Sequence, residues 1–146
     1  MNKSSKIIIR NSNNAPKPVG NYPHSVEVNN MLFISGIGPR NYKDNSIPGN
    51  IYDTNKKLIK YDINKQCYAV FENINSILKE SKLSLDNIID VTVFLIDMEK
   101  DFKIFNNIYS KYFKNSHACR TTVEVNKLPT DIAIELKCIA VMSGKK

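Results

Sequence analysis

The sequence predicts an α+β fold in which one mixed β-sheet carries two helices on one face. The first observation is the order of the predicted elements: strand, hairpin, helix, strand, helix, strand, strand. The second is periodicity, because two segments repeat apolar residues every three or four positions whereas the others alternate every two. The third is the length of 146 residues, which suits one domain with its own core. We therefore expect residues 1–146 to form a single domain.

The first predicted elements are strands. Residues 1–5 are typical of a flexible polar tail, and Lys6–Arg10 is a short strand of β-branched residues. Ser25–Ile37 predicts an antiparallel hairpin, because Asn29 and Asn30 between its apolar halves suit the positive φ angles of a two-residue turn.

The segment 38–61 is the least regular part of the sequence. It contains Pro39, Pro48 and Gly49 among many polar residues. Ile51-Tyr52 and Leu58-Ile59 predict a small hairpin within it.

Two amphipathic helices follow from the 3.6-residue repeat. Asp62 can cap the first helix, which begins at Ile63 and extends for about five turns. The second helix covers roughly Lys100–Lys114. Their apolar residues are Ile63, Cys67, Val70, Phe71, Ile74, Ile77 and Leu78 in the first helix, and Phe102, Phe105, Tyr109, Tyr112 and Phe113 in the second.

The remaining strands are predicted at Ile88–Ile96, Cys119–Asn126 and Ile132–Met142. In the first of these, alternation places Ile89, Val91, Val93 and Leu95 on one face and Thr92, Phe94 and Ile96 on the other. Because Thr92, Phe94 and Ile96 give their face of the sheet few polar groups, we expect that face to pack against other subunits in a symmetric homo-oligomer.

Composition narrows the classes of function. The net charge is +7, but the lysines are dispersed and form no dense block with interleaved aromatic residues, so specific nucleic-acid binding is not expected. No apolar run approaches the roughly 18 residues of a membrane span, and no signal peptide is evident at the start, so a cytoplasmic protein is expected. Three scattered cysteines and two distant histidines predict neither a disulfide framework nor a metal site.

Arg120 and Glu135 are the charged residues that stand out within predicted strands. The planar guanidinium of Arg120 suits bidentate binding of a carboxylate. The alternative is that Arg120 only ends a strand and pairs with Glu124 or Glu135. The spacing of Glu135 is that of a solvated edge carboxylate. The functional alternative is that Glu135 faces a cleft with Arg120 and orients or deprotonates a water molecule there.

Four further sites carry groups that a ligand can use. Asn106 lies within the apolar stripe of the second helix, where its amide either bridges backbone groups or points at a ligand. Tyr22 and His24 lie in an irregular loop of the kind that often closes over a site, and a lone loop histidine is usually surface decoration. Ser35-Gly36 ends a strand. The pair either offers a ligand a hydroxyl and close approach to the backbone, or it only makes a turn.

A family resemblance joins these residues. The run Cys119-Arg120-Thr121-Thr122 through Leu128-Pro129, followed by Ile134–Ala140, resembles the C-terminal signature of the RidA family, also called YjgF or L-PSP. Ala15–Ser25, Leu32–Gly36 and Asp101–Tyr109 agree in the same order, so the resemblance covers nearly the whole chain. It implies a chorismate-mutase-like α+β fold and homotrimers with ligand clefts between subunits.

The resemblance also implies an activity. Members hydrolyse reactive enamines and imines to a keto acid and ammonia without a cofactor. Carried over, it makes Arg120 the clamp for the substrate carboxylate and Glu135 the residue that positions or activates water. The matching pocket positions are Tyr22, Ser35, Gly36, Asn106, Thr122 and Pro129, with His24 as an additional candidate. The implied substrates are small 2-imino acids such as 2-iminobutanoate or 2-iminopropanoate.

Three departures from the family pattern bear on the substrate. Thr122 stands where many imine deaminases have a cysteine, and the loop 38–61 is longer than usual. Tyr22-Pro23-His24 is similar to 2-aminomuconate deaminases, so that activity is the closest alternative.

A binding module that holds a carboxylate metabolite through Arg120 is an alternative of another class. An endoribonuclease or translation inhibitor is disfavoured, because no general acid and base accompany a phosphate clamp.

Overall fold

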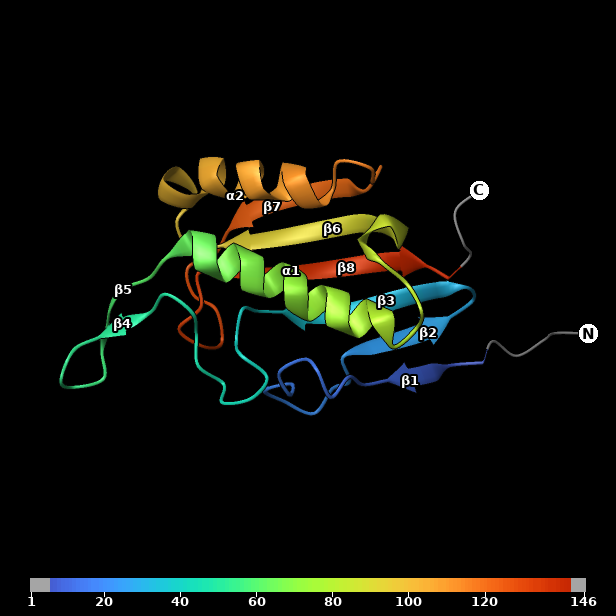
Figure 1. Cartoon of the computed structure of the whole chain (residues 1–146), viewed down its shortest axis with the longest axis horizontal. Helices are drawn as coiled ribbons and strands as arrows, with labels where there is room; N and C mark the ends of the chain where they lie inside the picture. The colour runs from blue at the N-terminus through green and yellow to red at the C-terminus, as the bar shows by residue number, and fades with distance from the viewer. Residues whose placement is uncertain (1–5, 143–146) are drawn as a thin grey trace, which may run out of the picture.

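The computed structural model describes residues 6–142, and the predicted tail at residues 1–5 lies outside them. Six strands form one mixed sheet (Figure 1), in which only β6 and β7 are parallel neighbours. In spatial order the strands are β1 (Ile8–Arg10), β2 (Ser25–Val28), β3 (Met31–Ile37), β8 (Ile134–Val141), β6 (Ile88–Leu95) and β7 (Cys119–Glu124). The predicted mixed sheet is therefore confirmed.

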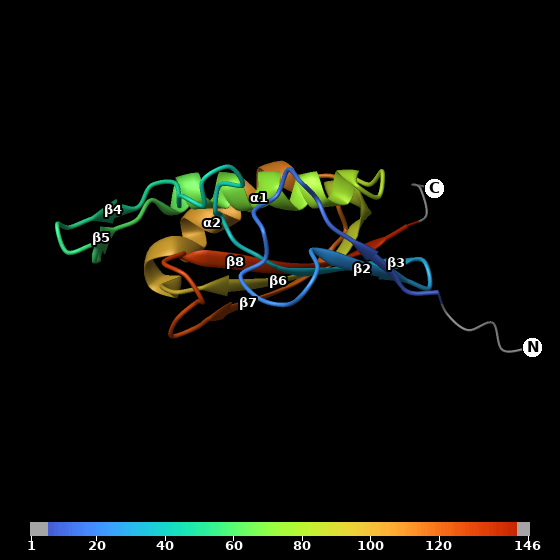
Figure 2. The ribbon, with the colours of Figure 1, turned by 90° about the horizontal axis from the view of Figure 1, so that it is seen from below.

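Both helices lie on the same side of this sheet, as Figure 2 shows, which confirms the predicted α+β arrangement. Helix α1 (Ile63–Lys79) begins at Asp62, whose side chain accepts a hydrogen bond from the backbone N–H of Lys65. Helix α2 (Met98–Tyr112) begins two residues earlier than predicted, because Asp97 accepts from the N–H of Lys100 and caps it. A short 3₁₀ helix (Leu85–Asn87) precedes β6.

The core lies between the two helices and the sheet. Side chains that alternate along β3, β6 and β8 meet the apolar stripes of α1 and α2 there, as the two periodicities require. The largest fully buried apolar side chains are Phe71, Phe105, Leu32, Ile34, Ile74, Ile77, Leu78, Ile88, Leu95, Ile134 and Leu136.

The opposite face of the sheet, hereafter the open face, is not covered by a helix (Figure 2). Phe33 pairs with Ile139 across β3 and β8, and Phe94 pairs with Val123 across β6 and β7. Phe33 is 38% exposed and Val123 is 37% exposed, so this face presents two apolar pairs, between which the register places Lys137, Thr92 and Thr121.

A β-bulge interrupts the pairing of β3 with β8. Ile34 pairs with Cys138 and Ile37 with Leu136, so the two residues Ser35 and Gly36 oppose the single residue Lys137. The bulge lets Ile34 and Ile37 both point into the core. Ser35 and Gly36 between them line a pocket of the open face.

A second bulge corrects one prediction about β6. Ile88 pairs with Ala140 and Asp90 with Ile139, which leaves Ile89 as an extra residue. Alternation alone had placed Ile89 on the same face as Val91, but Ile88 takes the buried position and Ile89 is 41% exposed. Val91, Val93 and Leu95 are buried as predicted, but Ile96, which was expected on the opposite face, follows the end of β6 and packs against the core.

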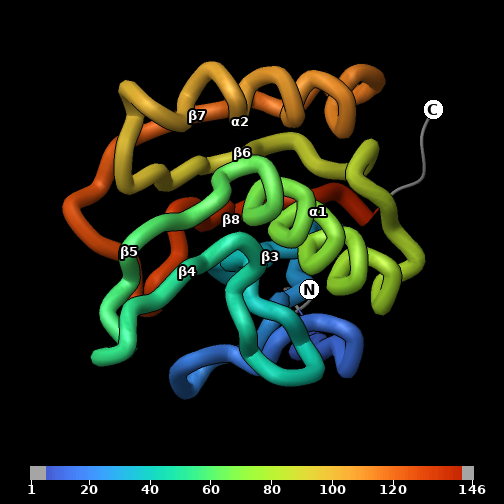
Figure 3. Tube along the Cα trace, turned by 60° about the vertical axis from the view of Figure 1, so that its left-hand side comes forward, coloured from blue at the N-terminus to red at the C-terminus, as the bar shows by residue number. Residues whose placement is uncertain are grey.

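The long segment 38–61 contains the predicted hairpin, formed by β4 (Ile51–Tyr52) and β5 (Leu58–Lys60). The hairpin extends away from the sheet in Figures 1 and 3. Its base is fixed by Gln66 of α1, which is fully buried. The Gln66 amide donates to Asn50 Oδ1 at 2.8 Å and accepts from the N–H of Ala133 at 2.7 Å. One side chain thus joins the long segment to the loop before β8.

The β2–β3 turn gives a test of the fold. Asn29 and Asn30 have φ angles of 48° and 65°, as predicted for a two-residue hairpin turn. Replacing Asn30 by a β-branched residue forces that residue into the left-handed region, at a cost of about 1–2 kcal/mol. We expect Asn30→Val to lower the melting temperature at fixed protein concentration and Asn30→Gly to preserve it. Equal melting temperatures for the two variants would contradict this role of the turn.

Candidate active site

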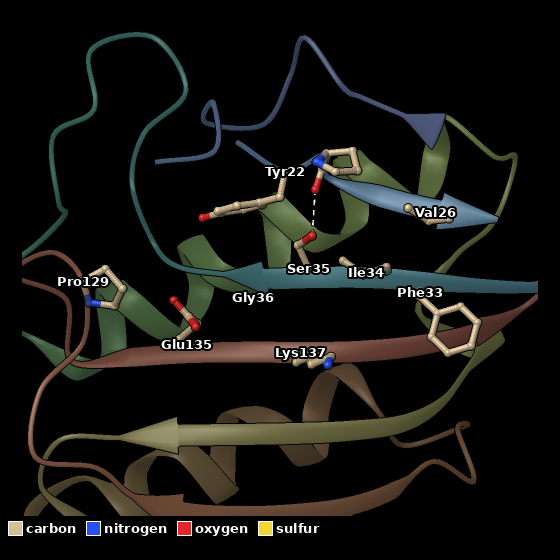
Figure 4. A pocket seen from close by; sticks show the side chains of 10 residues that line it. Tyr22, Val26, Phe33, Ile34, Ser35, Gly36, Pro129, Glu135 and Lys137 are labelled. Atoms are coloured by element: carbon tan, nitrogen blue, oxygen red, sulfur yellow. Dashed lines mark hydrogen bonds between the residues drawn. The ribbon is translucent and has the colours of Figure 1, made fainter. Parts of the chain in front are cut away.

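The main pocket opens on the open face beside β2, β3 and β8 and has a volume of about 480 Å³ (Figure 4). Its lining combines aromatic and aliphatic side chains with a few polar groups, as is typical of small-molecule sites. The lining residues are Tyr22, Pro23, Val26, Phe33, Ile34, Ser35, Gly36, Pro129, Glu135 and Lys137. Five of these, Tyr22, Ser35, Gly36, Pro129 and Glu135, are site residues predicted from the sequence.

Glu135 supplies the only carboxylate of the pocket lining. Alternation along β8 turns it away from the core, between the buried residues Ile134 and Leu136. Partial burial raises the pKa of its carboxyl above the usual glutamate value. A Cβ atom at Gly36 would lie 2.5 Å from Glu135 Oε1, so a side chain at this position would displace the carboxylate from its present place.

The hydroxyl of Ser35 is held in a fixed orientation at the rim of the bulge. It donates a hydrogen bond of 2.7 Å to the backbone oxygen of Pro23, shown dashed in Figure 4. Because its proton is engaged, the oxygen faces the pocket as an acceptor. Tyr22 is 43% exposed, and its ring lies on the side of the pocket that includes Gly36 and Glu135.

His24 has a structural position that the sequence prediction missed. The residue is 3% exposed rather than a surface group. Its Nδ1 accepts from the N–H of Ser12 at 3.0 Å, and its Nε2 lies 2.9 Å from the backbone oxygen of Pro16. The Nε2–H tautomer satisfies both partners. Neither ring nitrogen is therefore free for a substrate, which argues against His24 as a site residue.

Arg120 lies outside this pocket, on the outermost strand β7. Its partner in the register is Val91, which is buried beneath the helices, so Arg120 is on the helix side of the sheet. The guanidinium carbon is 4.6 Å from the ring centre of Tyr109 and 5.4 Å from that of Phe105. Within residues 6–142 it forms no salt bridge, so it pairs with neither Glu124 nor Glu135.

Asn106 and Thr122 belong to the same part of the molecule as Arg120. Thr122 follows Arg120 by two residues on β7 and faces the same side, and its buried Oγ1 has no hydrogen-bond partner in the described chain. Asn106 follows Phe105 on α2 and is half-buried. Glu124, next along this face of β7, accepts from the N–H of Met98 at 2.6 Å and fixes the start of α2.

The predicted residues therefore form two groups on opposite faces of the sheet. The pocket group is Tyr22, Ser35, Gly36, Pro129 and Glu135, and the edge group is Asn106, Arg120 and Thr122. Strand β6 separates β7 from β8. Arg120 and Glu135 of one chain consequently do not face a common cleft, contrary to the functional alternative considered from their spacing.

The structure adds pocket residues that sequence reasoning did not select. Lys137 lies two residues after Glu135 on the same face of β8, and Phe33 lies two before Ser35, so alternation alone could have indicated both. A narrow recess of about 30 Å³ beside Tyr22 and Glu135 is also lined by Arg40 from the long segment. No sequence pattern connects Arg40 with the distant Glu135.

Residues 6–142 contain neither a cluster of metal ligands nor a helix that could span a membrane. No group of three or more His, Cys, Asp or Glu side chains is placed to hold a metal ion. Among the same residues, the helices are too short or too polar to cross a bilayer. Cys67 and Cys138 are buried free thiols, and Cys119 is exposed.

Comparison with known proteins places the chain in a family. A protein-family model described as Endoribonuclease L-PSP matches residues 12–142. A RutC family protein of Pyrococcus horikoshii is 41% identical over 127 residues, which are 87% of this chain and 91% of that protein.

Solved structures agree with this assignment. A Rid family protein from Yersinia pestis superposes with a TM-score of 0.81 at 28% identity, covering 93% of this chain and 99% of that one. TdcF of E. coli, solved with bound serine, gives a TM-score of 0.79 at 31% identity over 93% and 99% of the two chains. The matched family model, the sequence identity and the shared α+β fold show that the chain belongs to the RidA/YjgF/L-PSP family.

Proposed function

We propose that this protein is a cofactor-free deaminase that hydrolyses small 2-imino acids, such as 2-iminobutanoate and 2-iminopropanoate, to keto acid and ammonia. The observation that carries the proposal is the pocket in which Glu135 lies against Gly36, beside Tyr22 and the Ser35 hydroxyl. An imine carbon is already electrophilic. A positioned water and an anchored carboxylate are therefore enough to accelerate its hydrolysis, and no strong nucleophile is required.

The proposed reaction assigns a proton to each step. Glu135 accepts a proton from water as the water oxygen bonds to the carbon of the protonated imine, which gives a neutral carbinolamine. The Glu135 carboxyl then gives this proton to the nitrogen, the carbon–nitrogen bond breaks and ammonia leaves. As the carbonyl forms, the Glu135 carboxylate takes the hydroxyl proton, which passes on to solvent or to the released ammonia. Ser35 Oγ, whose own proton is held by Pro23, can accept from the substrate N–H. The raised pKa of Glu135 suits a group that both takes and gives a proton.

The carboxylate clamp comes from a second copy of the chain in this proposal. Arg120 offers a guanidinium that has no carboxylate partner within residues 6–142, but it lies on the sheet face opposite to that of Glu135 in its own chain. The exposed apolar side chains of the open face, such as Phe33 and Val123, support self-association, and we propose a homotrimer. Its clefts would join Arg120, Asn106 and Thr122 of one copy to the Glu135 pocket of the next.

One similar structure and the description of the family model bear on the choice of ligand. TdcF holds serine, a small amino acid whose carboxylate and nitrogen resemble those of a 2-imino acid. The family model carries the word endoribonuclease, but RNA cleavage of that kind normally needs an acid and a base near the phosphate. The pocket lining has the single carboxylate of Glu135, and both nitrogens of His24 are bound to backbone groups. We therefore favour the deaminase, acting in the cytoplasm without a nucleic-acid or membrane partner.

The first test generates 2-iminobutanoate in place with a threonine dehydratase and adds semicarbazide as a competing trap. Wild type should suppress semicarbazone formation and release keto acid and ammonia. Glu135→Gln should lower kcat/KM by about 100-fold or more, the usual contribution of a positioned acid–base group. Arg120→Ala should lower it by about as much, because the substrate carboxylate loses its anchor. If wild type equals the protein-free control, the simple imine substrate is wrong. Muconate-type substrates and non-catalytic carboxylate binding would then be tested next.

Shared clefts predict that two inactive variants complement each other. Arg120→Ala and Glu135→Gln chains carrying different tags are co-expressed, and hybrids are isolated by tandem purification. A mixed trimer has one cleft with both residues intact, so about a third of wild-type activity should return. Hybrids as inactive as their parents would show that the two residues do not act across one interface.

The pH dependence follows from the burial of Glu135. Only the ionised carboxylate can take a proton from water, and burial raises the pKa of this group. As pH falls through that raised pKa, kcat/KM should fall, already above the ordinary glutamate value of about 4.3. The profile is measured after subtraction of spontaneous hydrolysis. A rate that stays constant down to the ordinary value would contradict the assignment of Glu135 as base.

A further inference from the structure

We propose that Tyr109, together with Phe105, is the positioning residue that holds the Arg120 guanidinium ready for a substrate carboxylate. This inference rests on the proposed function, because it concerns the group expected to bind the substrate. It assigns a role to two side chains of α2 that do not touch the main pocket.

The contacts of Arg120 are aromatic. Its guanidinium carbon lies 4.6 Å from the ring centre of Tyr109 and 5.4 Å from that of Phe105, within the range of cation–π attraction. The nearest acidic residue along the same face of β7, Glu124, is bound to the N–H of Met98. The rings therefore attract the cation without neutralising it.

A ring and a carboxylate use different parts of a guanidinium. An aromatic ring attracts the cation through its face, whereas the N–H donors of the guanidinium point outward in its plane. A guanidinium that lies flat on the Tyr109 ring keeps its fork of N–H groups free for bidentate binding. An acidic partner in the same place would occupy these donors and compete with the substrate.

Tyr109 is itself fixed in a column of rings. Its ring stacks on Phe113 with centroids 4.2 Å apart and planes within 2° of parallel. It also contacts Phe105 at 5.5 Å and Phe71 at 6.4 Å. Phe71 and Phe105 are fully buried, and Phe113 is 5% exposed, so the column belongs to the core. A side chain as flexible as arginine loses its freedom at this rigid surface before the substrate arrives.

The structure also offers a matched control in Tyr112, three residues later on α2. Tyr112 stacks on Phe71 with centroids 4.6 Å apart, but it makes no cation–π contact with Arg120. Tyr112→Leu removes the same atoms from the same helix, so it measures the loss of ring packing, together with the hydroxyl interaction with Glu72, without the loss of a cation–π contact.

The test compares Tyr109→Leu, Tyr109→Phe and Tyr112→Leu in the trapped 2-iminobutanoate assay. Tyr109→Leu should raise KM by about 3-fold to 30-fold, the range that corresponds to cation–π energies, with kcat changed less than twofold. Tyr109→Phe keeps the ring and should restore the wild-type KM. Tyr112→Leu should lower the melting temperature as Tyr109→Leu does and leave KM unchanged.

A binding measurement separates this inference from the proposed function. Calorimetry with the product 2-oxobutanoate should show the same loss of affinity in Tyr109→Leu, and a larger one in Arg120→Ala. If wild type and Arg120→Ala differ in turnover but Tyr109→Leu matches wild type in KM and Kd, the positioning role is wrong and the deaminase stands. If wild type shows no turnover but binds 2-oxobutanoate through Arg120 and Tyr109, the deaminase is wrong and the positioning role stands. If Arg120→Ala changes neither turnover nor binding, both are wrong.

Discussion

The polar lining of the pocket depends on the demand that Ile34 and Ile37 of β3 both be buried. In a regular strand, residues three apart point to opposite faces, so burying both requires one extra residue between them. The bulge at Ser35 and Gly36 supplies it, and both residues come to the open face opposite Lys137. Gly36 then leaves the space that the Glu135 carboxylate occupies. The burial of two isoleucines thus determines where a hydroxyl and a carboxylate meet.

Local signals in the sequence predicted most of the elements. Two apolar repeats identified the helices, Asp62 marked the start of α1, and Asn29-Asn30 identified the hairpin turn. The extra residue at Ile89 was not predictable, because it depends on the pairing of β6 with the distant β8. The burial of Gln66 was likewise not predictable, because its side chain is polar. It is fully buried because Asn50 and Ala133, from two separate loops, satisfy its amide.

The candidate site was predictable as a set of residues but not as an arrangement. The family resemblance selected Tyr22, Ser35, Gly36, Pro129 and Glu135, and the fold brings these five together. Spacing could not tell which face of the sheet each strand presents, since that depends on the register of β6 with both β7 and β8. This register separates Arg120 from Glu135 within one chain. The burial of His24 was not predictable, because its hydrogen-bond partners, Ser12 and Pro16, come from an irregular segment without periodicity.

The β4–β5 hairpin combines a fixed base with a free end. Beyond the Gln66–Asn50 bond, the Tyr61 hydroxyl, just after β5, donates to the buried Asp101 at 2.7 Å and ties the returning chain to α2. The turn between β4 and β5 lies away from the sheet in Figures 1 and 3, and Thr54 to Lys57 are exposed. Chain length can therefore change at this tip while the anchored base holds the loop of Pro129 in place. The tip is a natural point for grafting a peptide or attaching a fluorescent label.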